Sequence, residues 1–253
     1  MELVLDIGNS AIKGGFFEQE RLVRTFRISL DLAAAGPWEA TFGEHLEKAT
    51  PVRAGLVSVV PAVTARIREV LLHKAGVMPT VIGPETPLPF QLAYTTPHTL
   101  GADRLAAAAA AWTLYGTGTD GTPRSVVALD AGTAVTYDVV DRSGVFRGGP
   151  IGAGPDLIRR ALHQGTAQLP AVPLELPEEV IGRSTQEALQ SGLMYGFLDS
   201  VNGMLSRIRS RLNEAPYVVA TGGWSPLLHS HTSGINRVAP HLVLHGVRIL
   251  MGL

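Results

Sequence analysis

Short apolar runs alternate with polar turns along most of the chain, and two of these runs lead into nearly the same turn. The run at residues 3–5 continues as Asp-Ile-Gly-Asn-Ser at 6–10, and the run at 127–129 continues as Asp-Ala-Gly-Thr-Ala at 130–134. Runs of this kind predict buried strands, and glycine permits a tight turn directly after each. We therefore expect two equivalent strand–turn units half a chain apart.

The segments after the two turns also correspond. The first turn is followed by an apolar segment at 12–17, a charged turn and an apolar segment at 22–28. The second turn is followed by an apolar segment at 135–140, a turn and an apolar segment at 145–147. Each half thus begins strand, turn, strand, turn, strand before helices and strands alternate. This order predicts an α/β protein with a duplicated domain and a cleft between its halves.

The remaining pattern places the boundary between the halves. Glycine and threonine dominate residues 116–123, which predicts a hinge and divides the chain into 1–115 and 116–253. A proline-rich loop at 83–89 is expected at the edge of the cleft. The other expected elements are strands at 54–60, 79–82 and 217–221, helices at 63–75 and 105–115, and a long helix from residue 186.

Composition bounds the function classes. The 253 residues are 45% hydrophobic and 17% charged, which suits two compact domains, and the formal charge of -1 gives no electrostatic case for nucleic acid or anionic membrane as partners. Cysteine is absent, which excludes disulfides, thiolate nucleophiles and cysteine-ligated zinc and favours a cytoplasmic location. The first residues do not have the pattern of a signal peptide, and no apolar run approaches the ~18 residues that span a bilayer.

The two turns have the composition of phosphate-binding loops. Glycine lets backbone N–H groups approach an anion, and Asn9, Ser10 and Thr133 add short donors beside them. Asp6 repels phosphate, so its position at the strand end makes chemical sense mainly with a Mg²⁺ ion between them. Either turn alone is also explained as an ordinary hairpin.

An Asp-Arg pair precedes the alanine-rich helix at 105–115. In one interpretation Asp103 caps the helix and Arg104 is a surface charge. In the other, a carboxylate here takes the proton of an acceptor hydroxyl while the arginine holds that acceptor. The sequence around these two residues leaves both interpretations open.

The ordered set of motifs resembles the type III pantothenate kinases, within the actin-like superfamily that includes acetate and sugar kinases and heat-shock chaperones. The resemblance covers nearly the whole chain and implies two ribonuclease H-like (actin-like ATPase) domains with a nucleotide cleft between them. It implies phosphorylation of pantothenate by ATP to 4'-phosphopantothenate, the entry to coenzyme A synthesis. The matching motifs lie at residues 6–10, 101–104, 130–136, 148–151, 165–170 and 221–223.

The same resemblance implies roles for individual residues. Asp103 matches the general base, Asp6 lies near the magnesium ion, and Asp130 matches the ligand of an activating monovalent cation, K⁺ or NH4⁺. The family is homodimeric, with the substrate pocket against the partner subunit. Matching positions for ATP are Asp6, Ile7, Gly8, Asn9, Ser10, Ala11, Ile12, Lys13 and Thr133, and those for pantothenate are Tyr94, Gly101, Ala102, Asp103, Arg104 and Thr185.

Several of these positions have simpler explanations. Tyr94 is also explained by loop packing, Thr185 by an N-cap of the long helix, and the glycines at 222–223 by a turn after a strand, although the architecture would bring that turn to the adenosine. The histidines at 229 and 231 lack a third metal ligand nearby in sequence, so we expect a solvated loop there.

Two residues depart from the family pattern, and two other functions stay open. Thr96 stands where asparagine is frequent and Ala153 where proline is common, which affects the capping of the substrate loop and a turn near the phosphates.

A related kinase of another small alcohol or sugar is one alternative, because loops build the acceptor pocket. A nonenzymatic nucleotide-binding regulator is the other, and it has no use for a base at Asp103.

Overall fold

The chain forms two compact units. The structure is a computed structural model that describes residues 1–30 and 38–252. The first unit comprises Met1–Thr113 with His241–Leu253, and the second comprises Leu114–Pro240. This division falls two residues from the expected boundary at 115, and it assigns the C-terminal segment to the first unit, which the sequence did not. None of the described helices is long and apolar enough to cross a membrane.

A five-stranded sheet forms the centre of the first unit, in the order β3-β2-β1-β4-β5. β1 pairs antiparallel with β2 and parallel with β4, so that Asp6 lies opposite Lys13 on one side and Val57 on the other. The predicted strands are confirmed. Their bounds are β1 (Glu2–Ile7), β2 (Ala11–Glu18), β3 (Arg21–Ser29), β4 (Arg53–Ser58) and β5 (Thr80–Val81).

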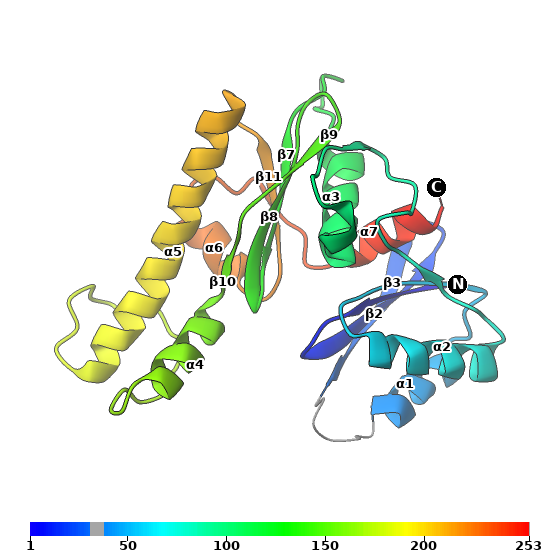
Figure 1. Cartoon of the computed structure of the whole chain (residues 1–253), viewed down its shortest axis with the longest axis horizontal. Helices are drawn as coiled ribbons and strands as arrows, with labels where there is room; N and C mark the ends of the chain where they lie inside the picture. Colours follow the sequence, from blue (N-terminus) through cyan, green and yellow to red (C-terminus); the bar gives the residue numbers. More distant parts are fainter. Residues whose placement is uncertain (31–37, 253) are drawn as a thin grey trace. The chain divides into compact units, whose positions relative to one another are not determined.

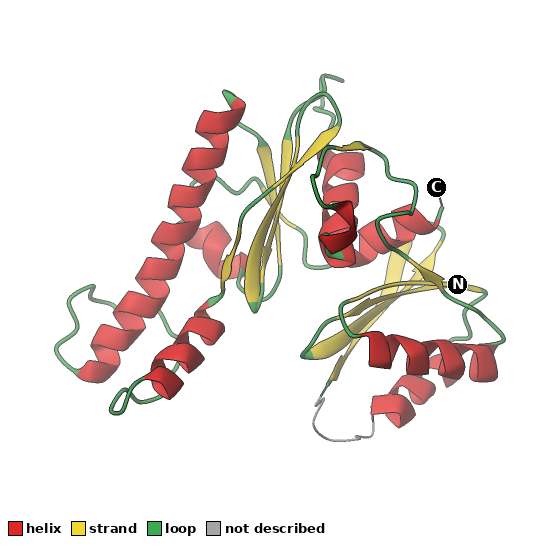
Figure 2. Ribbon diagram, in the orientation of Figure 1, coloured by secondary structure: helices red, strands yellow, loops and turns green. Residues whose placement is uncertain are grey.

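Helices cover both faces of this sheet (Figures 1 and 2). α1 (Trp38–Glu47) and α2 (Pro61–Ala75) pack on the face that presents the alternating side chains of Leu3, Leu5 and Ile7. α7 (Leu242–Met251) contacts β1 and β4 on the opposite face, where a Cβ at Gly55 would lie 2.3 Å from the sulfur of Met251. The unit also contains β6 (Gln91–Leu92), the 3-10 helix η1 (Pro97–Thr99) and most of α3 (Ala102–Tyr115).

The second unit repeats the arrangement of the first. Its strands run in the order β12-β11-β7-β8-β9, with β10 paired to β8. β7 pairs antiparallel with β8 and parallel with β11, so that Asp130 has Thr136 and Thr221 as neighbours, as Asp6 has Lys13 and Val57. The strands are β7 (Val126–Ala131), β8 (Ala134–Val140), β9 (Val145–Gly148), β10 (Ile151–Ala153), β11 (Tyr217–Thr221) and β12 (Arg237–Val238).

One long helix supplies most of the second core. α5 (Thr185–Leu212) buries Phe197, Val201 and Leu205 against alternate residues of β7 and β8, which makes it the predicted long helix. α4 (Pro155–Gly165) packs beside α5, as Figure 1 shows. α6 (Ser225–His231) contains both His229 and His231, so the loop predicted there is wrong. Residues 225–231 form a helix because Leu228 is fully buried in the core.

Candidate active site

The first Asp-x-Gly turn joins β1 to β2 through three residues. The Gly8 N–H donates to the Ala11 carbonyl over 3.0 Å, which closes the turn, and Asn9 and Ser10 are exposed at its tip. The turn is therefore a hairpin, the plainer alternative considered from the sequence. A hairpin with exposed short donors remains suited to an anion, because backbone and side-chain donors stand together.

Asp6 is the charged residue at the base of this turn, and it is only 8% exposed. Lys13 on β2 donates from Nζ to Asp6 Oδ2 over 3.2 Å. Burial raises the pKa of the Asp6 carboxyl above its usual value against the lowering effect of Lys13, and the negative charge of Asp103 raises it further. The structure therefore brings Asp6, Lys13 and Asp103 into one electrostatic neighbourhood within the first unit. A buried carboxylate of this kind suits a cation.

The second turn is shorter, since two residues join β7 to β8. The Gly132 N–H donates to the Ala134 carbonyl over 3.0 Å, so this turn closes over one residue fewer than the first, in which Gly8 bonds to Ala11. The Gly154 N–H donates to the Thr133 carbonyl over 2.8 Å, and a Cβ at residue 154 would lie 2.1 Å from the Gly132 oxygen. The side chain of Thr133 is exposed. The backbone of Gly154 therefore packs against one side of the turn, and the Thr133 side chain stays exposed to solvent.

Asp130 occupies in the second unit the place that Asp6 occupies in the first. It is the next-to-last residue of β7 and half-buried. Gly222, with a positive φ of 85°, approaches so closely that a Cβ there would lie 2.5 Å from Asp130 Oδ1. The double-glycine turn after β11 is thus packed against this carboxylate, a relationship that the strand-and-turn pattern alone did not reveal.

Asp103 lies in the first turn of α3, one residue inside the helix. Its Oδ1 accepts the Arg104 N–H over 2.9 Å, and the helix begins at Ala102, so Asp103 is not the N-cap. The carboxylate folds back over Gly101, where a Cβ would lie 2.4 Å from Oδ1. In the described part of the chain this carboxylate forms no ion pair. Asp103 therefore satisfies one free N–H group in the first turn of α3, as the capping interpretation expected, although it does so from inside the helix and not from the N-cap position. Gly101 has a steric reason to be glycine.

The neighbouring residues of the expected substrate loop are also ordered by local contacts. Arg104 is 6% exposed, so it is not the surface charge considered as an alternative, and Tyr94 is half-buried. The Thr99 hydroxyl donates to the Thr96 carbonyl over 2.8 Å, and the two hydroxyls are 2.8 Å apart. Thr96 thus stands at the N-terminus of η1, and its hydroxyl pairs with the Thr99 hydroxyl and caps no backbone N–H.

Thr185 is the first residue of α5, and its side chain is exposed. Ser184 is the N-cap, because its hydroxyl accepts the Glu187 N–H over 3.2 Å, while Glu187 accepts the Arg183 N–H over 2.7 Å. The interpretation of Thr185 as the cap is therefore wrong. Its hydroxyl has no hydrogen-bond partner within residues 1–30 and 38–252.

Each unit thus assembles one part of the predicted set. Asp6, Lys13 and Asp103 lie together in the first unit. Asp130 lies beside its turn in the second. The second unit also contains Ala153, the other departure from the family, opposite Ala134 in the β10–β8 pair. No group of three or more His, Cys, Asp or Glu residues in the described ranges could hold a metal alone. Asp6 fits Mg²⁺ as one carboxylate ligand, because Mg²⁺ commonly keeps waters and phosphate oxygens.

Comparisons with known proteins point to one family. The profile of the family described as type III pantothenate kinase matches residues 2–207. A type III pantothenate kinase of Geobacter sulfurreducens is 35% identical, and the match covers 99% of this chain and 98% of the relative. One from Listeria monocytogenes is 30% identical, with 99% and 96% covered.

Solved structures show the fold. A putative N-acetylmannosamine kinase from Listeria monocytogenes has a TM-score of 0.51 at 16% identity, with 99% of this chain and 98% of that chain covered. An inorganic polyphosphate/ATP-glucomannokinase from Arthrobacter has a TM-score of 0.51 at 15% identity, with 99% and 97% covered. The predicted actin-like ATPase fold is confirmed.

Proposed function

Because the chain belongs to the type III pantothenate kinase family, we propose that Asp103 is the general base when ATP phosphorylates pantothenate. The protein is a kinase that converts pantothenate and ATP to 4'-phosphopantothenate and ADP, the first step of coenzyme A biosynthesis. It uses ATP and a divalent metal ion, as its family implies. The assignment of individual residues is the part of this proposal that goes beyond the family.

The position of Asp103 is the observation that carries the assignment. The carboxylate is half-buried, and one of its oxygens accepts a hydrogen bond from the Arg104 N–H. It forms no ion pair with a described residue, so its negative charge is not neutralised by a neighbouring side chain. It accepts the proton of the pantothenate hydroxyl as the alcohol oxygen attacks the γ-phosphorus of ATP and the bond to the β,γ-bridging oxygen breaks. A proton thus passes to Asp103 and the phosphoryl group passes to the alcohol.

The rest of the first unit supplies binding. In our proposal the backbone and side chains of residues 6–13 contact the ATP phosphates, with Lys13 adding positive charge beside Asp6. A Mg²⁺ ion near Asp6 would neutralise phosphate charge in the transition state. Tyr94, Gly101, Ala102 and Arg104 form the pantothenate loop, in which Arg104 is held firmly by its burial.

The second unit completes the proposed set. Thr133 offers an exposed hydroxyl to ATP, and Asp130 supplies a carboxylate for K⁺ or NH4⁺. The fit of Asp130 to a cation rests on its half-buried position beside the backbone oxygens of the turn. Thr185 offers its hydroxyl to pantothenate, since Ser184 already caps the helix. A cytoplasmic location belongs to the same proposal, because the chain contains no cysteine.

A homodimer is also part of the proposal. Large apolar side chains are exposed on the elements before and around the start of α5, and Ile181, at 79% exposed, lies four residues before Thr185. Adjacent exposed apolar residues such as Val180 and Ile181 are candidates for a protein interface. A partner that covers them would lie close to Thr185. The exposed residues are Ile151, Leu157, Ile158, Val180 and Ile181.

The decisive experiment is Asp103→Asn, measured with pantothenate, ATP, Mg²⁺ and K⁺. We expect kcat to fall by ~10²–10⁴ because the base is lost, while ATP affinity and melting temperature stay unchanged. Asp199→Asn is the matched control, since Asp199 is exposed on α5 and should retain full activity. A fully active Asp103→Asn protein would remove Asp103 from this role. Hexoses and acetate should not replace pantothenate as the acceptor.

A further inference from the structure

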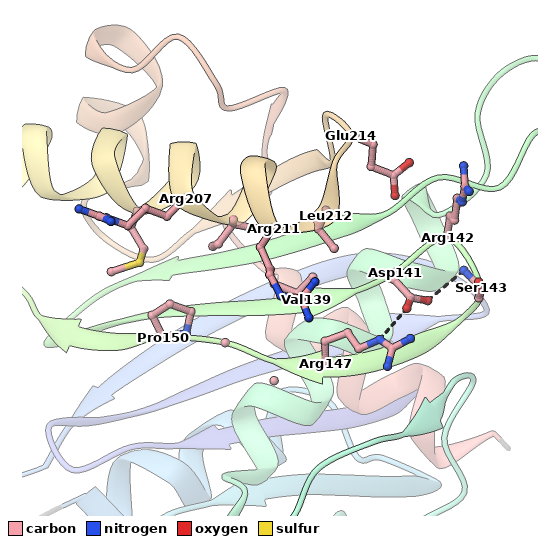
Figure 3. Close-up of a pocket in the computed structure, with 14 residues that line it drawn as sticks. Val139, Asp141, Arg142, Ser143, Arg147, Pro150, Arg207, Arg211, Leu212 and Glu214 are labelled. Atoms are coloured by element: carbon pink, nitrogen blue, oxygen red, sulfur yellow. Dashed lines mark hydrogen bonds and ion pairs between the residues drawn. The ribbon is translucent and has the colours of Figure 1, made fainter.

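The second unit contains a pocket remote from the Asp130 turn. It has a volume of about 640 Å³ and lies between the C-terminal half of α5 and the β8–β9 region (Figure 3). β7 and β8 pair with Val126 opposite Val140, whereas their turn is at Ala131 and Val135, so the Val139–Asp141 side of the pocket is at the other end of this hairpin. Its lining includes Gly148, Gly149 and Pro150 of the 148–151 motif, but none of the residues that were assigned a role in the kinase reaction above.

Arginine dominates the charge of this pocket. Four arginines and two acids line it, and both the helix and the strand side contribute guanidinium groups. In Figure 3 the Arg211 side chain extends from α5 toward the strands that carry Arg147. The charged lining residues are Asp141, Arg142, Arg147, Arg207, Arg211 and Glu214.

Both acids already have partners. Asp141 Oδ2 accepts from Arg147 Nε over 2.6 Å, and its Oδ1 accepts the N–H groups of Ser143 and Val145. Glu214 accepts the hydroxyl proton of Ser125. The charge of Arg147 is therefore balanced within the protein, whereas the positive charges on the α5 side are not.

Arg207 and Arg211 carry this excess charge. They are four residues apart on α5, so they lie on the same face and repel one another. Their side chains form no hydrogen bond or ion pair with any residue that the structure describes, and both are exposed. No negatively charged group in the described residues therefore offsets the repulsion between these two guanidinium groups.

The helix dipole explains only part of this arrangement. Arginine in the last turn of a helix is favourable, and Arg209 and Arg211 occupy that turn of α5. Arg209, however, points to another side, where its Nη2 donates to the Gly234 carbonyl over 3.0 Å. Arg207 lies before the last turn, and Arg142 comes from the strand side of the pocket. A cluster from two elements around a hollow is typical of an anion site.

The lining also has an apolar part. Met204, Ile208 and Leu212 follow one another at four-residue intervals along α5, so they form a stripe beside the arginines. Val139 and Pro150 add apolar surface from the strand side. The pocket volume falls within the ~300–1,000 Å³ of small-molecule sites, and such sites combine apolar walls with a few polar groups.

We propose that this pocket binds a small phosphate monoester whose phosphate pairs with Arg207 and Arg211 and whose apolar group rests on Met204 and Ile208. Guanidinium groups match phosphate oxygens in a two-point geometry, which favours phosphate as the anionic group. The pocket contains none of the residues that were assigned a role in the kinase reaction, and the proposal does not depend on the function proposed above.

Phenyl phosphate is a suitable probe because it contains both features of the proposed ligand. Its binding is measured by calorimetry on the full chain, with Mg²⁺ and a non-hydrolysable ATP analogue saturating the nucleotide site. We expect one site per chain and tighter binding of phenyl phosphate than of inorganic phosphate. The variant Arg207→Gln/Arg211→Gln should weaken phenyl phosphate binding at least tenfold and keep full kinase activity.

The control removes equal charge elsewhere. Arg21 and Arg68 are exposed in the first unit, so Arg21→Gln/Arg68→Gln should bind phenyl phosphate like the unchanged protein. The proposal is overturned if the unchanged protein binds no phenyl phosphate, if Arg207→Gln/Arg211→Gln binds it equally well, or if the control variant loses as much affinity. Melting curves of both variants establish that each is folded.

Discussion

The backbone of Gly222 lies directly against the carboxylate of Asp130. A Cβ at residue 222 would lie 2.5 Å from Asp130 Oδ1 and 2.5 Å from the Ala131 carbonyl oxygen, and Gly222 has a φ of 85°. Both facts require glycine, since an L-residue is strained at this φ and its Cβ has no space. The turn after β11 therefore fixes where the Asp130 carboxylate points.

We predict that Gly222→Ala displaces Asp130 and thereby impairs the monovalent cation site that we propose at this carboxylate. The added Cβ must push either the carboxylate or the backbone of β7, and displacement of a ligand or its support typically costs ~10–100-fold in metal affinity. The K⁺ concentration that gives half-maximal kinase activity should therefore rise by about tenfold or more. Titration of activity with KCl at saturating pantothenate and ATP measures this.

Gly223→Ala is the matched control for that experiment. A Cβ at residue 223 would meet no atom within 4 Å, although the residue is the direct neighbour of Gly222. Its K⁺ titration should overlay that of the unchanged protein. Equal behaviour of the two alanine variants would contradict the role assigned to Gly222.

A second prediction separates recognition from helix capping at the start of α5. Thr185→Val removes only a hydroxyl that no described residue uses, so we expect stability to be kept and the KM for pantothenate to rise ~10-fold, about the 1.4 kcal/mol of one hydrogen bond. Ser184→Ala should do the reverse, with a loss of ~1 kcal/mol of helix stability from the missing cap and little change in KM. Steady-state kinetics and melting curves distinguish the two, and an unchanged KM in Thr185→Val argues against substrate contact.

The burial of Asp6 predicts a conflict between stability and function. Its pKa is raised from 3.8 in the folded protein, mainly by burial, so the contribution of this carboxyl to stability is present below pH ~4 and is lost as the pH rises through the folded pKa. Without nucleotide, the Asp6→Asn variant should therefore melt a few degrees higher than the unchanged protein at pH 7. This difference in melting temperature should become smaller as the pH is lowered toward 4. The same variant should bind Mg²⁺-ATP more weakly.

Asp141 provides the control of opposite sign. Burial alone would raise its pKa, but hydrogen bonds from Arg147 and from the Val145 and Ser143 N–H groups outweigh burial and lower it. Its stabilising contribution is present at neutral pH and is lost as the pH falls through the folded pKa. The Asp141→Asn variant should therefore melt at a lower temperature than the unchanged protein at pH 7. This difference in melting temperature should also become smaller at acidic pH. A stabilising Asp141→Asn or a destabilising Asp6→Asn would contradict these electrostatics.

Local patterns were sufficient to predict the longer strands and the two turns, whereas the short strands β6, β10 and β12 were not predicted. Apolar runs ended by Asp-x-Gly identify β1 and β7, because a buried strand and a glycine turn each leave a signal within a few residues. The family resemblance supplied the order of the site motifs. The helix at 225–231 was missed because its stability comes from burying Leu228 in a core that other segments build.

The contacts that shape the site could not be read in the same way. Gly154 and Gly222 approach the second turn from segments that are distant in sequence, and a glycine in a polar stretch looks the same whether it faces solvent or a carbonyl. The N-cap of α5 is Ser184, one residue before the expected Thr185, and α3 begins at Ala102, three residues before the expected start at 105; helix ends are the least certain part of such predictions. Assignment of the C-terminal helix to the first unit likewise depends on long-range packing on β1 and β4.

The exposed apolar residues before α5 give the last prediction. Ile181→Asp places a charge where we propose a second copy of the chain, and a charge that is buried without a partner costs several kcal/mol, enough to dissociate a dimer. We expect a shift from dimer to monomer in analytical ultracentrifugation, with a parallel loss of pantothenate affinity because Thr185 is close in sequence. Val52→Asp is the control, since Val52 is 71% exposed on the other unit and should leave mass and kinetics unchanged. A protein that sediments as a monomer before mutation, or an Ile181→Asp variant that stays dimeric, would contradict this interface.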